Sequence, residues 1–367
     1  MADPAAAEKR NYCALPPLPV RELSPDIPHD RARAILLGSA KWVNGTVLHY
    51  YFFDKDTDGE QVRLSNGQRR FVSWVGAEDQ RQVVRDSFAK WKSLPLGLDF
   101  QEVTDRSDAE VRIGFMNTDG AWSYIGRQVL DQGVNDRTMN FGWDLTTPYG
   151  HTTALHEIGH TLGLPHEHQN PFAGIVWDEA AVYTFFAGDP NFWPRDQTFS
   201  NVLKKLSSAE VSGSTWDPDS IMEYDFPPGL IKGPAQYKDG IHPPGTLSQV
   251  DQDWARKWYP GEAGLQEVAL QPFVSAPLSL KAGEQADFLI EPSASRRYQM
   301  ATFGTADTVM VLFEDDGGEL RYLKGDDDSG TDSNAKLTTK LVKGRRYRLK
   351  VRLYWAGDSG QTAVMYW

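Results

Sequence analysis

The stretch HEIGHTLGLPHEHQ (residues 156–169) holds four of the eight histidines of the chain and two of its glutamates. In a helix, His156 and His160 lie four residues apart on one face, where both imidazoles can bind one metal ion. Gly163 can adopt the left-handed conformation that ends a helix, and the turn that follows brings back His166 as a third nitrogen ligand. Three neutral imidazoles leave one coordination position open, which is typical of a catalytic rather than a structural zinc site.

Glu157 lies beside the two helical histidines and can reach a water molecule bound to the metal, so we predict that it acts as the general base. His168 follows two residues after His166 and could compete with it as a ligand, although the spacing favours His166. The alternative interpretation, a helix with solvated histidines, is disfavoured because the pattern HExxHxxGxxH rarely arises by chance. Zinc is favoured as the metal, although three imidazoles could also hold cobalt or copper.

The composition disfavours several classes of partner. The chain has 367 residues, enough for two or three domains, and a net charge of −12 from 38 basic and 50 acidic residues. It contains no cluster of basic residues, so nucleic acid and anionic membrane surfaces are disfavoured. No apolar run approaches the roughly 20 residues that span a bilayer. Cys13 is the only cysteine, so no intramolecular disulfide can form.

The first residues, MADPAAAEKRNYCALPPLPV, do not combine a basic segment with a following apolar one, so they contain no recognisable signal peptide. The absence of an intramolecular disulfide is compatible with a reducing compartment, but many exported bacterial proteins also lack disulfides. The sequence patterns therefore leave the location of the protein open.

Periodicity predicts an α+β domain around the histidine-rich stretch, and we place it at residues 41–262. Residues 42–53 are predicted to form a strand, and residues 79–94 an amphipathic helix. Three further strands are predicted before the histidine helix, the last of them at residues 138–143. A helix at residues 247–260, followed by a Pro-Gly stop signal, closes the domain.

The patterning changes near residue 270, where alternating strands separated by Gly and Asp turns replace the helical periodicity. We expect residues 270–367 to form an all-β sandwich. The acidic turn GDDDSGTDSN (residues 325–334) could bind Ca²⁺ through clustered carboxylates, and a solvated turn is the alternative. A docking face for protein or glycan could be built from four aromatic residues that core packing explains equally well: Tyr354, Trp355, Tyr366 and Trp367.

The histidine pattern followed by a methionine turn is the signature of the metzincin peptidases, and SIMEY (residues 220–224) supplies Met222 in the expected place. Among metzincins the chain resembles the astacin family. The resemblance rests on Glu167 after the third histidine, Tyr224 two residues after Met222, GAWSYIGR (residues 120–127) and LSQVDQDWARKWY (residues 247–259). It covers about residues 40–260, and its four motifs occur in the family's order.

Two departures from the family pattern stand out. Glu223 lies where the family usually has a histidine, at a position not expected to bind metal. Ala121 replaces a cysteine of the animal members, whose two disulfides cannot form here, so a bacterial or fungal branch of the family fits better. In animal members the glutamate after the third histidine contacts a mature N-terminus, a use of Glu167 that the preceding 40 residues leave open.

The resemblance implies a zinc endopeptidase with a twisted mixed sheet, an active-site helix and a Met-turn subdomain, acting on polypeptide substrates. It also favours export. Glu157 is expected to take a proton from the zinc-bound water and pass it to the leaving amine. Met222 is expected to form an apolar floor beneath the metal. Tyr224 is expected to be a distant fifth ligand that moves to stabilise the tetrahedral intermediate, and an ordinary half-buried tyrosine is the alternative.

The strand TMNFGW (residues 138–143) is expected to be the edge strand against which a substrate peptide pairs its backbone. A plain core strand is the alternative. The residues implicated in this pairing are Asn140, Phe141, Gly142 and Trp143. The C-terminal β-sandwich loosely resembles the pre-peptidase type of module found in secreted bacterial proteases.

Residues 1–40 are proline-rich and weakly patterned, and we expect an N-terminal arm. The thiolate of Cys13 in this arm could occupy the open zinc position and hold the enzyme latent, as cysteine switches do in other metzincins. A free cysteine in a flexible arm is the alternative. The leading hypothesis is thus a zinc endopeptidase, with or without an inhibitory arm. A binding protein whose β-sandwich docks to protein or glycan is the second hypothesis.

Overall fold

The structure is a computed structural model that describes most of the chain: residues 10–17, 41–42, 46–64, 66–206, 215–259, 261, 268–281, 284–317, 319–354 and 359–367. Trp355 and most of the predicted arm lie outside the described residues. Within them, no helix is both long and apolar enough to cross a membrane.

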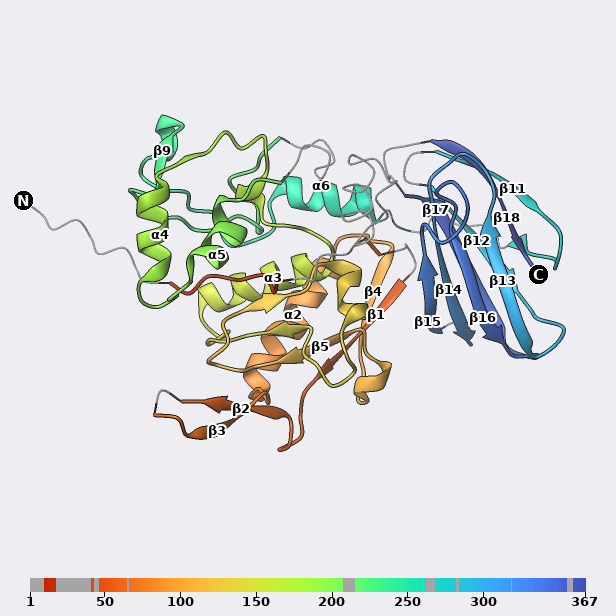
Figure 1. The fold of residues 1–367 in the computed structure, drawn as a ribbon, viewed down its shortest axis with the longest axis horizontal. Coiled ribbons are helices and arrows are strands. Elements are labelled where there is room, and N and C mark those ends of the chain that lie inside the picture. Colours follow the sequence, from red (N-terminus) through yellow and green to blue (C-terminus); the bar gives the residue numbers. More distant parts are fainter. Residues whose placement is uncertain are drawn as a thin grey trace, which may run out of the picture. The chain divides into compact units, whose positions relative to one another are not determined.

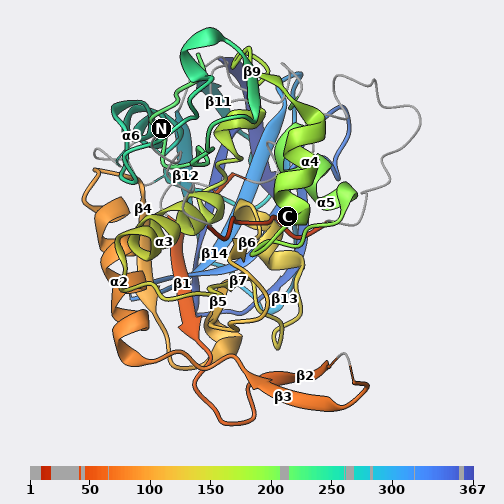
Figure 2. The same ribbon diagram turned by 90° about the vertical axis from the view of Figure 1, so that its left-hand side faces the viewer.

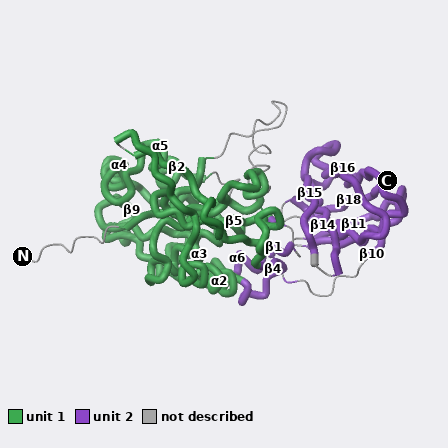
Figure 3. Tube along the Cα trace, turned by 90° about the horizontal axis from the view of Figure 1, so that it is seen from below, with its two compact units in different colours: residues 1–41, 49–91, 102–252 green, residues 42–48, 92–101, 253–367 purple. Residues whose placement is uncertain are grey.

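The chain divides into two compact units, which Figure 3 distinguishes by colour. The first comprises residues 1–41, 49–91 and 102–252, and the second comprises residues 42–48, 92–101 and 253–367. Helices and a mixed sheet characterise the N-terminal part of the chain, and two further sheets follow in its C-terminal part. The predicted α+β fold followed by an all-β sandwich is therefore confirmed.

Five strands form the sheet of the α+β part: β1 (Thr46–Phe52), β4 (Leu98–Glu102), β5 (Val111–Gly114), β6 (Trp122–Ser123) and β7 (Met139–Asn140). Their order is β4-β1-β5-β7-β6. The neighbours β1 and β5 are parallel, as are β5 and β7, whereas β6 pairs antiparallel with β7. Strand β6 therefore forms one edge of the sheet. A separate hairpin pairs β2 (Gly59–Arg63) with β3 (Arg69–Ser73) (Figure 1).

Two helices, α2 (Glu78–Lys92) and α3 (Pro148–Thr161), lie beside this sheet (Figure 2). Helix α2 buries an apolar face that includes Phe88 and Trp91, as its periodicity predicts. The indole nitrogen of Trp91 donates to the carbonyl of Leu155 at 3.1 Å and so ties α2 to α3. The side chain of Thr147 caps the first turn of α3, which has Pro148 at its start.

The rest of the α+β part contains α4 (Glu179–Ala187), α5 (Arg195–Thr198) and α6 (Gln249–Trp258), together with the short strand pair β8 (Val176–Trp177) and β9 (Ile231–Gly233). One buried apolar cluster joins α4 to the segment after Met222 through Val182, Phe186, Tyr224 and Phe226. Short helical turns connect these elements: η1 (Arg106–Asp108), η2 (Gly126–Asp131), η3 (Glu167–Gln169), η4 (Phe199–Leu203) and η5 (Ala235–Tyr237).

The C-terminal part contains two sheets with one core between them. One sheet has the order β10-β12-β17-β14-β15 and the other β11-β18-β13-β16. Side chains from both sheets meet in a single buried cluster, as expected of a sandwich. The strands are β10 (Val268–Ala269), β11 (Ala276–Leu280), β12 (Gln285–Ile290), β13 (Arg296–Thr302), β14 (Thr308–Asp316), β15 (Glu319–Asp326), β16 (Lys336–Leu341), β17 (Arg346–Leu353) and β18 (Gly360–Tyr366).

Two of the aromatic residues predicted as docking candidates are buried in this part. Tyr366 belongs to the core cluster and Tyr354 is 1% exposed. Their rings therefore pack inside the fold, which was the alternative that the sequence left open.

A prediction follows from the close approach of α3 to Met222. A Cβ added by Gly159→Ala would lie 2.4 Å from the sulfur of Met222, well inside van der Waals contact. We expect this substitution to lower the free energy of unfolding by about 1–2 kcal/mol, because overpacking outweighs the gain in helix propensity. Urea unfolding measures this. Gly233→Ala is the control, since its Cβ would meet Val176 at an ordinary 3.8 Å. Equal losses in both variants would contradict the argument.

Candidate active site

Helix α3 carries His156, Glu157 and His160 into the interior, where all three side chains are buried. The helix ends directly after them. Leu162 is its C-cap, and Gly163 follows with φ of 96°, the left-handed region that favours glycine. This turn redirects the chain so that His166 is also completely buried.

The three histidines converge with a residue from the other end of the chain. One ligand atom from each of Cys13, His156, His160 and His166 can be chosen such that all four lie within 4.8 Å of one another. The two Nε2 atoms of His160 and His166 are 3.2 Å apart, and the sulfur of Cys13 is 3.5 Å from Nε2 of His160. The described part of the chain therefore gathers a thiol and three imidazoles at one point.

Two backbone carbonyls fix the orientation of the helical histidines. Nδ1 of His156 donates to the carbonyl of Ile221 at 2.8 Å, and Nδ1 of His160 donates to the carbonyl of Leu164 at 2.7 Å. Each ring thus turns its unprotonated Nε2 towards the shared centre. Nε2 of His156 is buried and has no hydrogen-bond partner among the described residues.

The donor set fits a zinc ion. Burial lowers the pKa of His156 to about 4 and that of His160 and His166 well below the usual value, so the imidazoles are neutral as metal ligands must be. Their converging lone pairs repel each other unless a cation lies between them. Three imidazoles and one thiol make up a four-coordinate set that zinc prefers. These four residues form the zinc site of the protein.

Glu157 is placed to act beside this centre. Its carboxyl group is completely buried, with Oε2 3.5 Å from the sulfur of Cys13 and Oε1 without a hydrogen-bond partner among the described residues. Burial raises the pKa of Glu157 to about 8, against a smaller lowering by the contact with Cys13. A carboxyl group with such a pKa can both accept and return a proton near neutral pH.

The described residues of the arm, 10–17, run between α3 and α4 (Figure 1). The backbone of the arm is held from several sides. Tyr224 donates its phenol hydrogen to the carbonyl of Cys13, and the amide of Ala14 donates to the carbonyl of Ala121 at 3.1 Å. The phenol of Tyr224, which was expected to stabilise the tetrahedral intermediate, thus contacts the arm.

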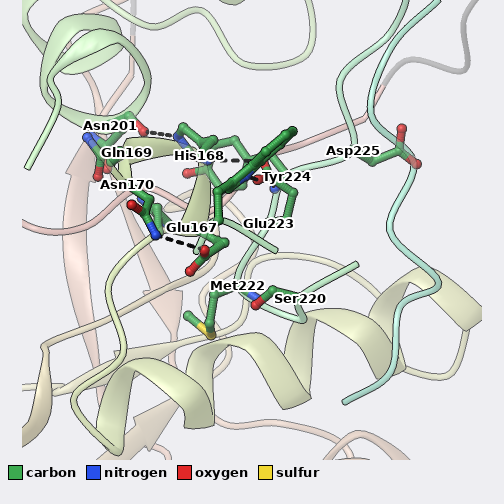
Figure 4. Close-up of polar contacts among 12 residues, drawn as sticks. Glu167, His168, Gln169, Asn170, Asn201, Ser220, Met222, Glu223, Tyr224 and Asp225 are labelled. Atoms are coloured by element: carbon green, nitrogen blue, oxygen red, sulfur yellow. Dashed lines mark hydrogen bonds and ion pairs between the residues drawn. The ribbon is translucent and has the colours of Figure 1, made fainter. Parts of the chain in front are cut away.

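Met222 and the residues beside it form a tight turn that packs on helix α3 (Figure 4). The sulfur of Met222 lies against Gly159 of α3, which agrees with the expected apolar floor. The turn is fixed by the buried carboxylate of Asp251, which accepts from the hydroxyl of Ser220 at 2.6 Å and the amide of Ile221 at 2.8 Å. Since Ile221 also holds His156, Asp251 acts on the metal centre through the turn.

His168 does not join the metal centre. Its Nε2 contacts the carbonyl of Asn201 at 2.8 Å, and its Nδ1 lies 3.6 Å from Oε1 of Glu223 (Figure 4). The other oxygen of Glu223 accepts from the indole of Trp216 at 2.8 Å. Glu223, which stands where the family usually has a histidine, therefore lies beside His168, the histidine outside the metal-binding pattern. The sequence contains both residues but no local signal that they meet.

The prediction that β7 is the edge strand was wrong, because β7 lies between β5 and β6. The amide side chain of Asn140 is buried and donates to the carbonyls of Met116 and Gly120, a structural use. Phe141 is buried, and Gly142 lies against the backbone of Gly120. The arm instead bonds to Ala121, the residue directly before the edge strand β6.

Trp143 is the member of this group that reaches the cleft. It lines a cavity of about 430 Å³ together with His156, Glu157 and Tyr224. Its indole nitrogen donates to the hydroxyl of Thr153 on α3 at 3.0 Å. Trp143 therefore borders the catalytic groups, whereas the three residues before it support the sheet.

The acidic turn at residues 325–334 has a structural use for one of its carboxylates. Asp326 accepts from the amides of Ser329 and Lys336 at 2.9 and 2.8 Å. Among the described residues, metal ligands converge at the centre of Cys13 and the three histidines, and no such group lies in this turn. The Ca²⁺ site stays a prediction.

The segment that holds the three histidines matches a known peptidase family. The sequence model of that family, Astacin, matches residues 72–227. Serralysin of Photorhabdus luminescens is 26% identical over 153 residues, which are 37% of this chain and 30% of that protein. The chain thus spans about a third of that relative's length.

Two solved structures are similar to separate parts of the chain. Myroilysin is 28% identical, with a TM-score of 0.52, over 62% of this chain and 98% of that one. The pre-peptidase C-terminal domain of a collagenase from Bacillus anthracis is 14% identical, with a TM-score of 0.25, over 29% of this chain and 99% of that domain.

The role of Asp251 gives a second prediction. We expect Asp251→Asn to lower the free energy of unfolding by about 2 kcal/mol, because the amide cannot accept from all three donors that the carboxylate serves. Zinc affinity should fall by about tenfold, since the carbonyl of Ile221 would no longer be held against His156. Urea unfolding and competition with a zinc chelator measure the two effects. Asp253→Asn, an exposed change on the same helix, is the control, and equal affinities in both variants would refute the coupling.

Proposed function

We propose that the protein, whose residues 72–227 match the sequence model of the astacin family of metallopeptidases, is a zinc-dependent endopeptidase held latent by its N-terminal arm. The observation that carries the proposal is the convergence of Cys13, His156, His160 and His166 beside the buried carboxyl group of Glu157. Three histidines leave one position for a reactive ligand, and here the arm's thiol lies at that position.

The chemistry that zinc supplies at such a site is a lowered pKa of bound water and polarisation of the scissile carbonyl. The residues of the chain do the rest. Glu157 takes the proton of the attacking water and returns it to the leaving amine. The hydrogen bonds from His156 and His160 to backbone carbonyls keep both rings in one tautomer throughout.

Tyr224 stabilises the oxygen that gains negative charge when the peptide carbonyl is attacked. Its phenol already donates to a peptide carbonyl, that of Cys13, at the centre of the cleft. Burial raises the pKa of this phenol, so it stays protonated and able to donate. A preorganised donor in a buried site favours the transition state without reorganisation.

Latency follows from what the arm covers. The sulfur of Cys13 lies 3.5 Å from both Glu157 and His160, so water and substrate have no access to the same point. Cys13 is 6% exposed. We take residues 1–40 as the inhibitory arm, residues 41–262 as the peptidase domain and residues 270–367 as an accessory sandwich.

A docking function of the sandwich is not favoured by a specific observation. Tyr354 and Tyr366, two of its four aromatic candidates, are buried. Polypeptides are therefore the partners that the proposal assigns to this chain.

Hydrolysis of unfolded casein tests the function. We expect the full chain to be nearly inactive and Cys13→Ala to raise its activity at least tenfold, since thiolate–zinc bonding is lost. Adding Glu157→Gln to Cys13→Ala should remove the activity by several orders of magnitude while zinc stays bound. Equal activity of the full chain and Cys13→Ala would remove the inhibitory role. Undiminished activity of the double variant would refute the mechanism.

The role of Tyr224 is tested in the same Cys13→Ala background. We expect Tyr224→Phe to lower kcat about a hundredfold with little change in KM, because the lost hydrogen bond acts in the transition state. Steady-state kinetics on a quenched fluorescent peptide measure both constants. Tyr237→Phe is the control, since that ring packs on Trp216 within the same apolar cluster. An unchanged kcat would mean that Tyr224 only holds the inhibitory arm and does not act in catalysis.

A further inference from the structure

Besides the ion pair of Arg10 with Asp225, the arm is held through groups that every peptide possesses. Two phenols reach its carbonyls, since Tyr149 donates to Asn11 and Tyr224 donates to Cys13. The side chain of Asn191 bonds to both the carbonyl of Arg10 and the amide of Tyr12. Such backbone hydrogen bonds fix the path of an extended chain without selecting its side chains.

One side chain of the arm is recognised by a shaped pocket, that of Tyr12. The centroid of its ring lies 5.0 Å from that of Phe186, 5.2 Å from that of Tyr224, 6.0 Å from that of Phe185 and 6.4 Å from that of Phe226. Three of these contacts are edge-to-face or tilted, arrangements that aromatic pairs prefer. Tyr12 is 5% exposed, so the pocket encloses almost the whole residue.

The pocket also has a polar end. The phenol of Tyr12 donates to the backbone carbonyl of Asp225 at 2.6 Å. This carbonyl is fixed in place because Phe226 bonds through its amide and its carbonyl to Ile241. An apolar wall that ends in one acceptor suits a tyrosine better than a phenylalanine, which would leave the carbonyl without that donor.

The pocket adjoins the catalytic groups. Tyr12 directly precedes Cys13, whose sulfur lies at the metal centre. The cavity that Tyr12 lines is also lined by His156, Glu157 and Asp225. A peptide following the path of the arm would thus place a side chain in this pocket next to the bond that is cleaved.

We propose that the pocket formed by Phe185, Phe186, Tyr224 and Phe226 is the main specificity pocket of the enzyme, and that it selects peptides with a tyrosine at a position flanking the cleaved bond. In the latent protein Tyr12 fills it as a pseudo-substrate. The proposal rests on the peptidase function proposed above, and it adds the class of side chain that the enzyme recognises.

The first test measures binding and does not depend on activity. Tyr12→Ala in the full chain empties the pocket, and N-acetyl-tyrosinamide should then raise the unfolding temperature. N-acetyl-phenylalaninamide should bind roughly fivefold more weakly, as expected for one lost hydrogen bond, and N-acetyl-alaninamide should have no effect. The unsubstituted chain should not respond, because Tyr12 occupies the site. No stabilisation of Tyr12→Ala, or equal stabilisation by all three amides, overturns the proposal.

The second test applies whether or not Tyr12→Ala folds. The full chain with Cys13→Ala, in which a substrate side chain must displace Tyr12 from the pocket, is given a mixture of peptides, and the residues around each cleaved bond are identified. Tyrosine should be enriched over alanine at one flanking position on the order of a hundredfold, and over phenylalanine roughly fivefold. Phe185→Ala, at the partly exposed rim, should reduce the enrichment about tenfold.

Tyr183→Ala is the matched control for the second test. It removes an aromatic ring from the same helix, but that ring packs on Arg195 rather than on Tyr12. Its cleavage pattern should equal that of the parent. Hydrolysis without aromatic enrichment overturns the pocket and leaves the peptidase function intact. Binding of tyrosinamide by a chain that hydrolyses no peptide supports the pocket and rejects the function.

Discussion

Two hydrogen bonds to backbone carbonyls determine which nitrogen of each helical histidine faces the metal centre. His156 is held by Ile221 in the methionine turn, and His160 by Leu164 in the turn after α3. Both carbonyls belong to segments that must be folded before the rings are oriented. The amide of Glu167 bonds to the carbonyl of Met222 and joins these two segments to each other. The zinc ligands are therefore a property of the tertiary structure, although their spacing is local.

Burial sets the second constraint. The side chains of His156, Glu157, His160 and His166 lie in the interior, where charged forms are costly. Neutral imidazoles satisfy that constraint and are also the form that binds zinc. For the carboxyl group of Glu157 the working form is the charged one. Its function requires it to ionise, whereas burial raises its pKa and favours the neutral form. A bound cation nearby would offset that effect, so the metal and the base stabilise each other in their working states.

The sequence allowed prediction of the features that depend on spacing along one helix. His156, Glu157, His160 and the helix-ending Gly163 follow from the 3.6-residue period and the conformational freedom of glycine. The order of strands in the sheet does not follow from such patterns, and the edge position of β7 was wrong because β6, a strand of two residues, pairs outside it. Short strands carry too little periodicity for their neighbours to be inferred.

The contacts between distant segments of the chain lay beyond sequence reasoning for a different reason. Glu223 and His168 are 55 positions apart and meet only because the methionine turn packs on the segment after His166. The affinity of thiolates for zinc was a reason to expect Cys13 at the metal, but no sequence pattern determines the path of the arm. That path depends on Asn191, Tyr149 and Tyr224, none of which has a motif for binding the arm.

Two adjacent residues, Tyr12 and Cys13, hold the arm in different ways, and the loss of one contact does not release the arm while the other remains. The sulfur of Cys13 lies at the metal centre, where it would be the ligand that water replaces on a bound zinc ion. Tyr12 binds through a large buried ring, which must be withdrawn before the backbone can move away. A change at the thiol alone removes the inhibitory ligand but leaves the ring in its pocket, where it competes with substrate as an attached ligand at high effective concentration. Complete release thus requires that the chain between the arm and the domain be cut or that the substrate's own side chain displace Tyr12.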